Sequence, residues 1–96
     1  MRLPFMLACL CAVPAPAETL RIAVYNAALS ADAPGALMAA LEAGESDRAA
    51  AVAEIVQRVN PDILLLAEID HDPEGRTAAA FNDNFLAVSQ NGAAPI

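Results

Sequence analysis

Two short apolar runs stand out along the chain, separated by segments with helical spacing. The first run, residues 20–25, is rich in β-branched and aromatic side chains and ends at Asn26, a pattern that is typical of a β-strand. The second run, residues 62–67, is apolar at consecutive positions and is followed by Glu68. A strand of that kind is covered on both faces, as in a parallel sheet layered with helices. We therefore expect two strands, the second of them buried on both sides.

A short helix is predicted directly after the first strand. Residues 35–43 place Leu37, Met38 and Leu41 on one side of a helix. Gly44 is well placed to end it, because glycine adopts the left-handed backbone of a helix terminus without steric cost.

A longer helix with a clearer pattern is predicted to follow. Ser46 can cap its start, and Asp47 in the first turn is favoured by the helix dipole. The residue before a proline is pushed out of the helical region, so Asn60 and Pro61 end the helix. The spacing i, i+3, i+4, i+7 predicts one buried face, which consists of Val52, Ile55, Val56 and Val59.

The middle of the chain thus reads strand–helix–strand, which indicates an α/β fold. A crossover of this kind is right-handed in nearly all proteins and leaves its two strands parallel. The carboxyl ends of the strands, at Asn26 and Glu68, are then expected to point the same way. A polar turn over residues 70–75 and a helix over residues 77–87, burying Phe81 and Phe85, complete the expected elements, and residues 89–92 resemble a turn.

Residues 1–17 have the pattern of a secretory signal peptide. Arg2 gives a positive start, residues 3–13 carry no charge, and residues 15–17 supply the small side chains that a signal peptidase recognises. We expect cleavage before Glu18. The uncharged stretch is well short of the roughly 20 residues that span a bilayer, so we expect a secreted or periplasmic protein without a membrane span in its mature form.

Cleavage changes both the thiol content and the charge of the mature chain. Cys9 and Cys11 lie within the signal peptide, so the mature part has no disulfide and no thiolate ligand. Arg2 is one of 5 basic residues, and its removal leaves four against 12 acidic ones. An acidic protein of this kind presents no basic nucleic-acid surface, and a bridging cation would have to neutralise a phosphate ester.

Asn26 and Glu68 are the candidate site residues, because each stands at the end of an apolar strand. Open α/β sheets bind ligands just outside the carboxyl ends of their strands. Glu68 offers a hard oxygen ligand suited to Mg²⁺, and Asn26 can donate to a phosphate oxygen or accept from a metal-bound water. The ordinary alternatives are a turn asparagine and the first solvated residue after a buried strand.

The densest polar cluster follows the second strand, at Asp70, His71, Asp72 and Glu74. A metal site or an acid/base histidine is conceivable here, but an exposed acidic turn is the favoured interpretation. His71 is the only histidine, which excludes a histidine pair within this chain. The glycines are too far apart for a dinucleotide-binding or P-loop motif.

The paired strand-end motifs resemble the start of the endonuclease/exonuclease/phosphatase superfamily. The resemblance is carried by residues 20–26, by Asn60-Pro61-Asp62 at a helix end, and by residues 63–68. In that family a first strand ends in asparagine, and a second ends in a glutamate that binds the catalytic metal. Residues 68–72 are similar to exported bacterial members, whereas Ala67 departs from the glutamine that many members carry.

The resemblance implies a fold, a cofactor and a reaction. Residues 18–96 would be an amino-terminal fragment, the opening strand–helix–strand portion of a two-sheet α/β sandwich with flanking helices. Glu68 would hold Mg²⁺ (or Mn²⁺ or Ca²⁺), and Asn26 would help to orient a phosphoester substrate whose type is open. The family's catalytic histidine lies well downstream, so we expect this chain to be inactive by itself. The alternative is an exported, non-enzymatic α/β binding or structural module.

Overall fold

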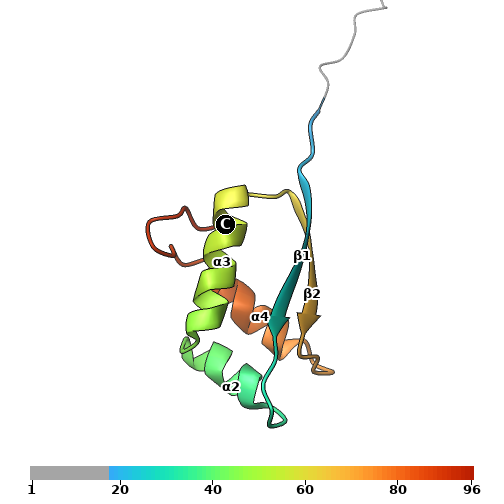
Figure 1. Cartoon of the computed structure of the whole chain (residues 1–96), viewed down its shortest axis with the longest axis vertical. Helices are drawn as coiled ribbons and strands as arrows, with labels where there is room; N and C mark the ends of the chain where they lie inside the picture. The colour runs from blue at the N-terminus through green and yellow to red at the C-terminus, as the bar shows by residue number, and fades with distance from the viewer. Residues whose placement is uncertain (1–17) are drawn as a thin grey trace, which may run out of the picture.

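The computed structural model describes residues 18–96, and the predicted signal peptide lies outside them. The described part has mixed α/β structure, with one sheet and helices in the order expected for a crossover (Figure 1). Its elements are β1 (Ile22–Leu29), α2 (Ala36–Ala43), α3 (Asp47–Val59), β2 (Ile63–Ile69), α4 (Arg76–Phe81) and the π-helical segment η1 (Asn82–Leu86).

The two strands pair in parallel, as the sequence predicts. Ile22 lies opposite Ile63 at the start of the sheet, and the pairing is regular as far as Asn26, which lies opposite Ala67. Both strands continue beyond their predicted ends, because a shift of register lets the pairing resume between Leu29 and Ile69. The expectation that β1 ends at Asn26 is therefore wrong, and Glu68 likewise lies inside β2.

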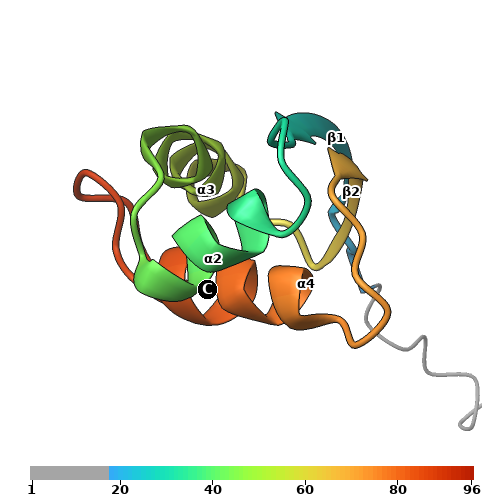
Figure 2. The ribbon, with the colours of Figure 1, turned by 90° about the horizontal axis from the view of Figure 1, so that it is seen from below.

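The helices of residues 18–96 lie on one side of the sheet, as the view from below shows (Figure 2). Leu29 of β1 and Leu41 of α2 are almost completely buried and belong to the same hydrophobic core. Phe81 and Phe85 are buried as predicted, and their rings stack with centroids 6.1 Å apart. The core therefore joins one face of the sheet to α2, α3, α4 and η1.

The opposite face of the sheet is apolar and exposed in the described residues. Exposed fractions are 65% for Ile22, 71% for Val24, 52% for Ile63 and 61% for Leu65. The expectation that β2 is covered on both faces is thus not met within residues 18–96. The reason is geometric, since alternate side chains of a strand point to opposite faces and the helices supply cover on one side alone.

Helix α3 begins and ends as predicted, but its buried face is rotated. The hydroxyl of Ser46 accepts the Ala49 amide at 3.1 Å, and Asn60 ends the helix with a left-handed backbone. Ile55 and Val59, which were expected to be buried, are 45% and 41% exposed. The buried face is instead made of Ala49, Val52, Ala53, Val56 and Gln57. This face is the one that Gln57 joins to the segment around η1, so packing against that segment decides which side of α3 is buried.

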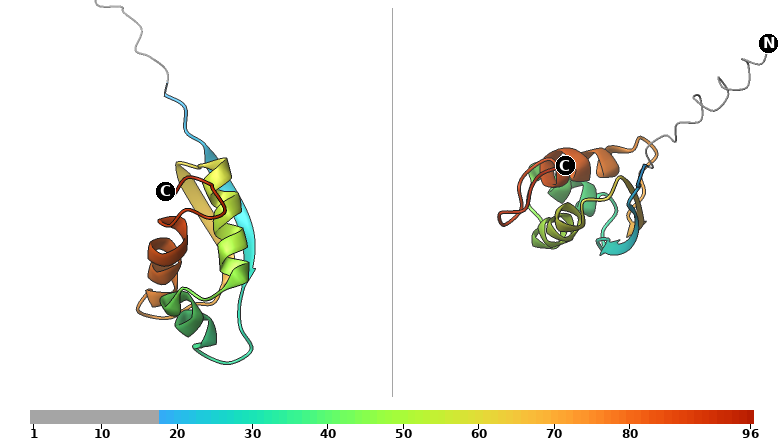
Figure 3. Two further views of the ribbon diagram at one scale, coloured as in Figure 1. Left: turned by 90° about the vertical axis from the view of Figure 1, so that its left-hand side faces the viewer. Right: turned by 90° about the horizontal axis from the view of Figure 1, so that it is seen from above.

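Gln57 fastens α3 to the carboxyl-terminal segment, which runs beside it (Figure 3). Its side-chain oxygen accepts the Gln90 amide at 3.0 Å. Its side-chain nitrogen donates at 2.8–3.2 Å to three carbonyl oxygens, those of Phe85, Leu86 and Val88. Both polar groups of the buried Gln57 side chain are thus hydrogen-bonded to the backbone at and after η1, which explains how a polar residue can occupy the packed face of α3.

Candidate functional site

The structure brings Asn26 and Glu68 to neighbouring positions near the carboxyl ends of the two strands. Both arrows point toward the same end of the sheet (Figure 1). Asn26 pairs with Ala67, the residue next to Glu68, and both candidate side chains are exposed. The parallel pairing therefore places the two predicted residues at the same end of the sheet, called the site edge below.

A β-bulge interrupts the strand pairing at this site edge. Between the last regular pair and the pair of Leu29 with Ile69, β1 has two residues, Ala27 and Ala28, opposite the single Glu68. Ala28 has φ 48° and Glu68 has φ 56°, a left-handed backbone that non-glycine residues seldom adopt. Each such residue costs about 1–2 kcal/mol, so the surrounding structure must compensate. Bulges and left-handed residues of this kind concentrate at functional sites.

The left-handed backbone changes where Glu68 lies. Strict alternation would place residue 68 on the same face as Leu64 and Leu66, which are half-buried against the core. Glu68 is instead exposed. Its carboxylate takes part in none of the hydrogen bonds or ion pairs among residues 18–96, so it can accept a cation without first losing a protein partner.

The amide of Asn26 is partly engaged within the bulge. Its side-chain oxygen accepts the Ala28 amide at 3.0 Å, which supports the left-handed backbone of Ala28. An amide oxygen has a second lone pair, and the amide nitrogen has two further donors. Asn26 can therefore stabilise the bulge and still donate to a phosphate oxygen.

Whether a metal ion fits at the strand ends depends on the side-chain ligands available there. No group of three or more carboxylate, histidine or cysteine side chains that could hold a metal occurs in the described part of the chain. Mg²⁺ keeps several waters and is often held by one or two carboxylates together with substrate phosphates. An exposed Glu68 fits as one ligand of such an open site, and it does not fit a closed structural site.

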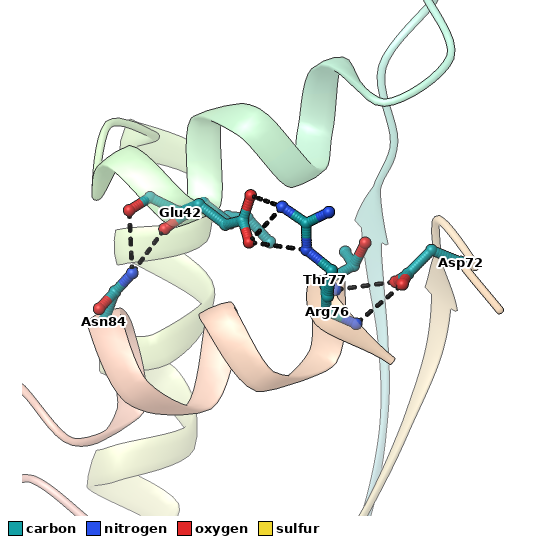
Figure 4. Close-up of polar contacts among 6 residues, drawn as sticks. Glu42, Asp72, Arg76, Thr77 and Asn84 are labelled. Carbon is teal, nitrogen blue, oxygen red and sulfur yellow. Dashed lines mark hydrogen bonds and ion pairs between the residues drawn. The ribbon is translucent and has the colours of Figure 1, made fainter. Parts of the chain in front are cut away.

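Asp72 acts as a cap for α4, which supports the structural interpretation of the acidic turn. Its carboxylate accepts the backbone amides of Thr77 and Arg76, each at 2.8 Å (Figure 4). These two amides, Thr77 first, lower the pKa of Asp72 from 3.8 to about 2. The neighbouring His71 and Glu74 are exposed.

A polar contact between α2 and α4 fixes the helical layer beside this turn, and the sequence reasoning missed it. Arg76 meets the Glu42 carboxylate with contacts of 2.7–3.1 Å, and this carboxylate raises the pKa of Arg76 (Figure 4). The amide of Asn84 donates to the Leu41 carbonyl at 2.9 Å. No local pattern could have indicated these contacts, because their partners are more than 30 residues apart.

Two hollows formed by residues 18–96 differ in size and in their distance from the candidate residues. A recess of about 60 Å³ lies beside the turn, lined in part by Met38, Asp70 and His71, and it is much smaller than the pockets of roughly 300–1,000 Å³ that bind small molecules. A larger hollow of about 610 Å³ lies at the start of α3, and neither Asn26 nor Glu68 lines it. Asn26 and Glu68 themselves are exposed at the carboxyl ends of the strands.

Within residues 18–96, no helix has both the length and the apolar character needed to cross a membrane. Comparisons with protein-family models, with curated proteins and with solved structures found no match.

Proposed function

We propose that the carboxyl ends of β1 and β2 form part of the active site of a metal-dependent phosphoester hydrolase. In this proposal Glu68 is a ligand of the metal, and Asn26 orients the phosphate or the ligand shell. The observation that carries it is that parallel pairing brings both residues to one end of the sheet, where Glu68 lies in a bulge, exposed and with a left-handed backbone.

The chemistry of the two side chains supports this assignment. A bound Mg²⁺, or Mn²⁺ or Ca²⁺, would polarise the phosphoryl oxygen and stabilise the charge of the leaving group. Glu68 would hold this cation through its carboxylate, while the Asn26 nitrogen would donate to a phosphate oxygen. The chain has a formal net charge of −7, so a cation is needed to bring a phosphoester to this edge.

The proposal includes the wider fold, a two-sheet α/β sandwich to which residues 18–96 contribute the opening strand–helix–strand portion. Its support is the exposed apolar face of the sheet, with Val24 and Leu65 at its centre. Parallel strands are normally covered on both faces, so we infer that a further layer packs there in the intact fold. Export to the periplasm or the exterior belongs to the same proposal.

Metal binding is tested directly by titrating the isotopically labelled chain with Mn²⁺ and following its amide spectrum. We expect paramagnetic broadening to centre on residues 67–69 and on Asn26, and to be lost in Glu68→Gln. The matched control is Glu45→Gln, an exposed glutamate beyond the end of α2, which should leave the broadening unchanged. Broadening that persists in Glu68→Gln, or that is spread evenly over the acidic residues, would contradict the assignment.

A non-enzymatic α/β module is the second candidate. It is favoured by the lack of a three-ligand group within residues 18–96 and by the engagement of the Asn26 oxygen with Ala28. Under this alternative Asn26 only stabilises the bulge. Because this chain is expected to be inactive by itself, the absence of turnover fits both candidates, and the Mn²⁺ titration separates them. Turnover of generic phosphomonoesters or phosphodiesters with Mg²⁺ or Mn²⁺ that disappears in Glu68→Ala would exclude the non-enzymatic module.

A further inference from the structure

Asp70 ties together the two chain segments that leave the sheet at the candidate site. Its backbone amide donates to the Leu29 carbonyl at 3.0 Å, and its carboxylate accepts the Ala31 amide at 3.0 Å. Leu29 is the last residue of β1, and Asp70 directly follows β2. One residue thus closes a bridge between the two strand ends, immediately beyond the bulge.

This bridge restrains the backbone on the carboxyl side of Glu68. The regular pairing of Asn26 with Ala67 holds the chain on one side of Glu68, and the two bonds of Asp70 hold it on the other. Between these fixed points β1 has one residue more than β2. The left-handed backbone of Glu68 persists because pairing on both sides over-determines it.

We propose that Asp70 is a positioning residue, which holds Glu68 in its left-handed backbone and thereby keeps the Glu68 carboxylate directed away from the helix-covered face. The consequence for metal binding rests on the proposed function, whereas the effect on the Glu68 backbone does not. The role proposed for Asp70 is structural and rests on its two bonds to the end of β1 and to Ala31, not on a contact with the metal.

The chain contains a matched control at the other end of the same strands. The carboxylate of Asp62 accepts the Arg21 amide at 2.8 Å, which also links the two strands by a carboxylate–amide bond. Asp62→Ala removes a bond of the same type at the start of the sheet. A general loosening of strand pairing would therefore follow either substitution, while a positioning effect on Glu68 follows only from the loss of Asp70.

The experiment compares the full chain with its Asp70→Ala, Asp70→Asn and Asp62→Ala variants by amide NMR. In Asp70→Ala we expect exchange of the Ala31 amide to accelerate on the order of tenfold, as for the loss of one hydrogen bond to a charged acceptor. The shifts and the intraresidue amide–Hα contact of Glu68 should move from left-handed toward extended values, and its Mn²⁺ response should weaken several-fold. Asp70→Asn keeps an acceptor oxygen and should restore both backbone signals.

Two outcomes would overturn the positioning role: unchanged Glu68 shifts in Asp70→Ala, or an equal change in Asp62→Ala. If Asp70→Ala fails to fold, Ala31→Pro removes the same bond from the donor side, and the same change at Glu68 is required of it. A wild-type chain whose Glu68 shows no Mn²⁺ response would remove the metal assignment, and the backbone signals would still decide the role of Asp70.

Discussion

The two faces of the sheet are built from similar residues and have different surroundings. On one face Tyr25, Leu64 and Leu66 pack against the helical core, while on the other Val24 and Leu65 are exposed. Because both strands alternate between the faces, hydrophobicity alone does not distinguish them. We therefore expect the stability of residues 18–96 to reside in the helix-covered side of the sheet.

The largest expected effect is the loss of a core side chain on the covered side. Leu41 of α2 is 0% exposed, so Leu41→Ala should lower the free energy of unfolding by about 2–5 kcal/mol. Urea unfolding of the purified chain measures this change. A cost below about 1 kcal/mol would show that the helical layer does not carry the stability.

Replacing Gln57 should have the next largest effect, because its side chain hydrogen-bonds to several backbone groups at once. Gln57→Leu keeps the volume but removes the bonds of the Gln57 side chain to three carbonyls and to the Gln90 amide, which should cost about 1–3 kcal/mol. The control is the exposed neighbour Ile55→Ala, for which a smaller loss is expected. Equal losses for both variants would mean that the network adds little to the covered side.

Asp72 gives the covered side a dependence on pH. Its pKa is lowered to about 2 from an ordinary 3.8, so the folded state binds the proton less readily than the unfolded state. The stabilisation is therefore fully present above about pH 4 and is lost as the pH falls through about 2. Denaturant midpoints at pH 5, 3 and 2 should fall less steeply in Asp72→Asn than in the wild type. Asp83→Asn, a change at an exposed carboxylate of η1, should retain the wild-type slope, and an identical slope in Asp72→Asn would contradict the capping role.

The smallest effect is expected on the exposed face. Val24→Thr should change the free energy of unfolding by no more than about 0.5 kcal/mol, because Val24 has few apolar contacts to lose. Leu66→Thr on the covered face should cost clearly more in the same urea experiment. Should Val24→Thr prove as costly as Leu66→Thr, the two faces would have equivalent cover in solution.

Much of the local structure follows from short-range patterns. Ser46 and Asn60 mark the ends of α3 as predicted, since capping depends on a few neighbouring residues. Phe81 and Phe85 are buried as expected, but the single helix predicted around them consists of the α-helix α4, which contains Phe81, and the π-helical segment η1, which contains Phe85. The rotated face of α3 was not predictable from spacing, because alanines and Gln57 become buried only through what packs against them.

The sequence by itself determined the order of the elements, the parallel direction of the strands and the nearness of Asn26 and Glu68. These follow from periodicity, capping and the handedness of a crossover, which are local or topological rules. Tertiary structure alone decided which face of the sheet is covered and where the register shifts. Ala28 and Glu68 have no intrinsic preference for a left-handed backbone. Their conformation arises because strand pairing and the bonds of Asp70, contacts between residues some 40 positions apart, hold both ends of the bulge.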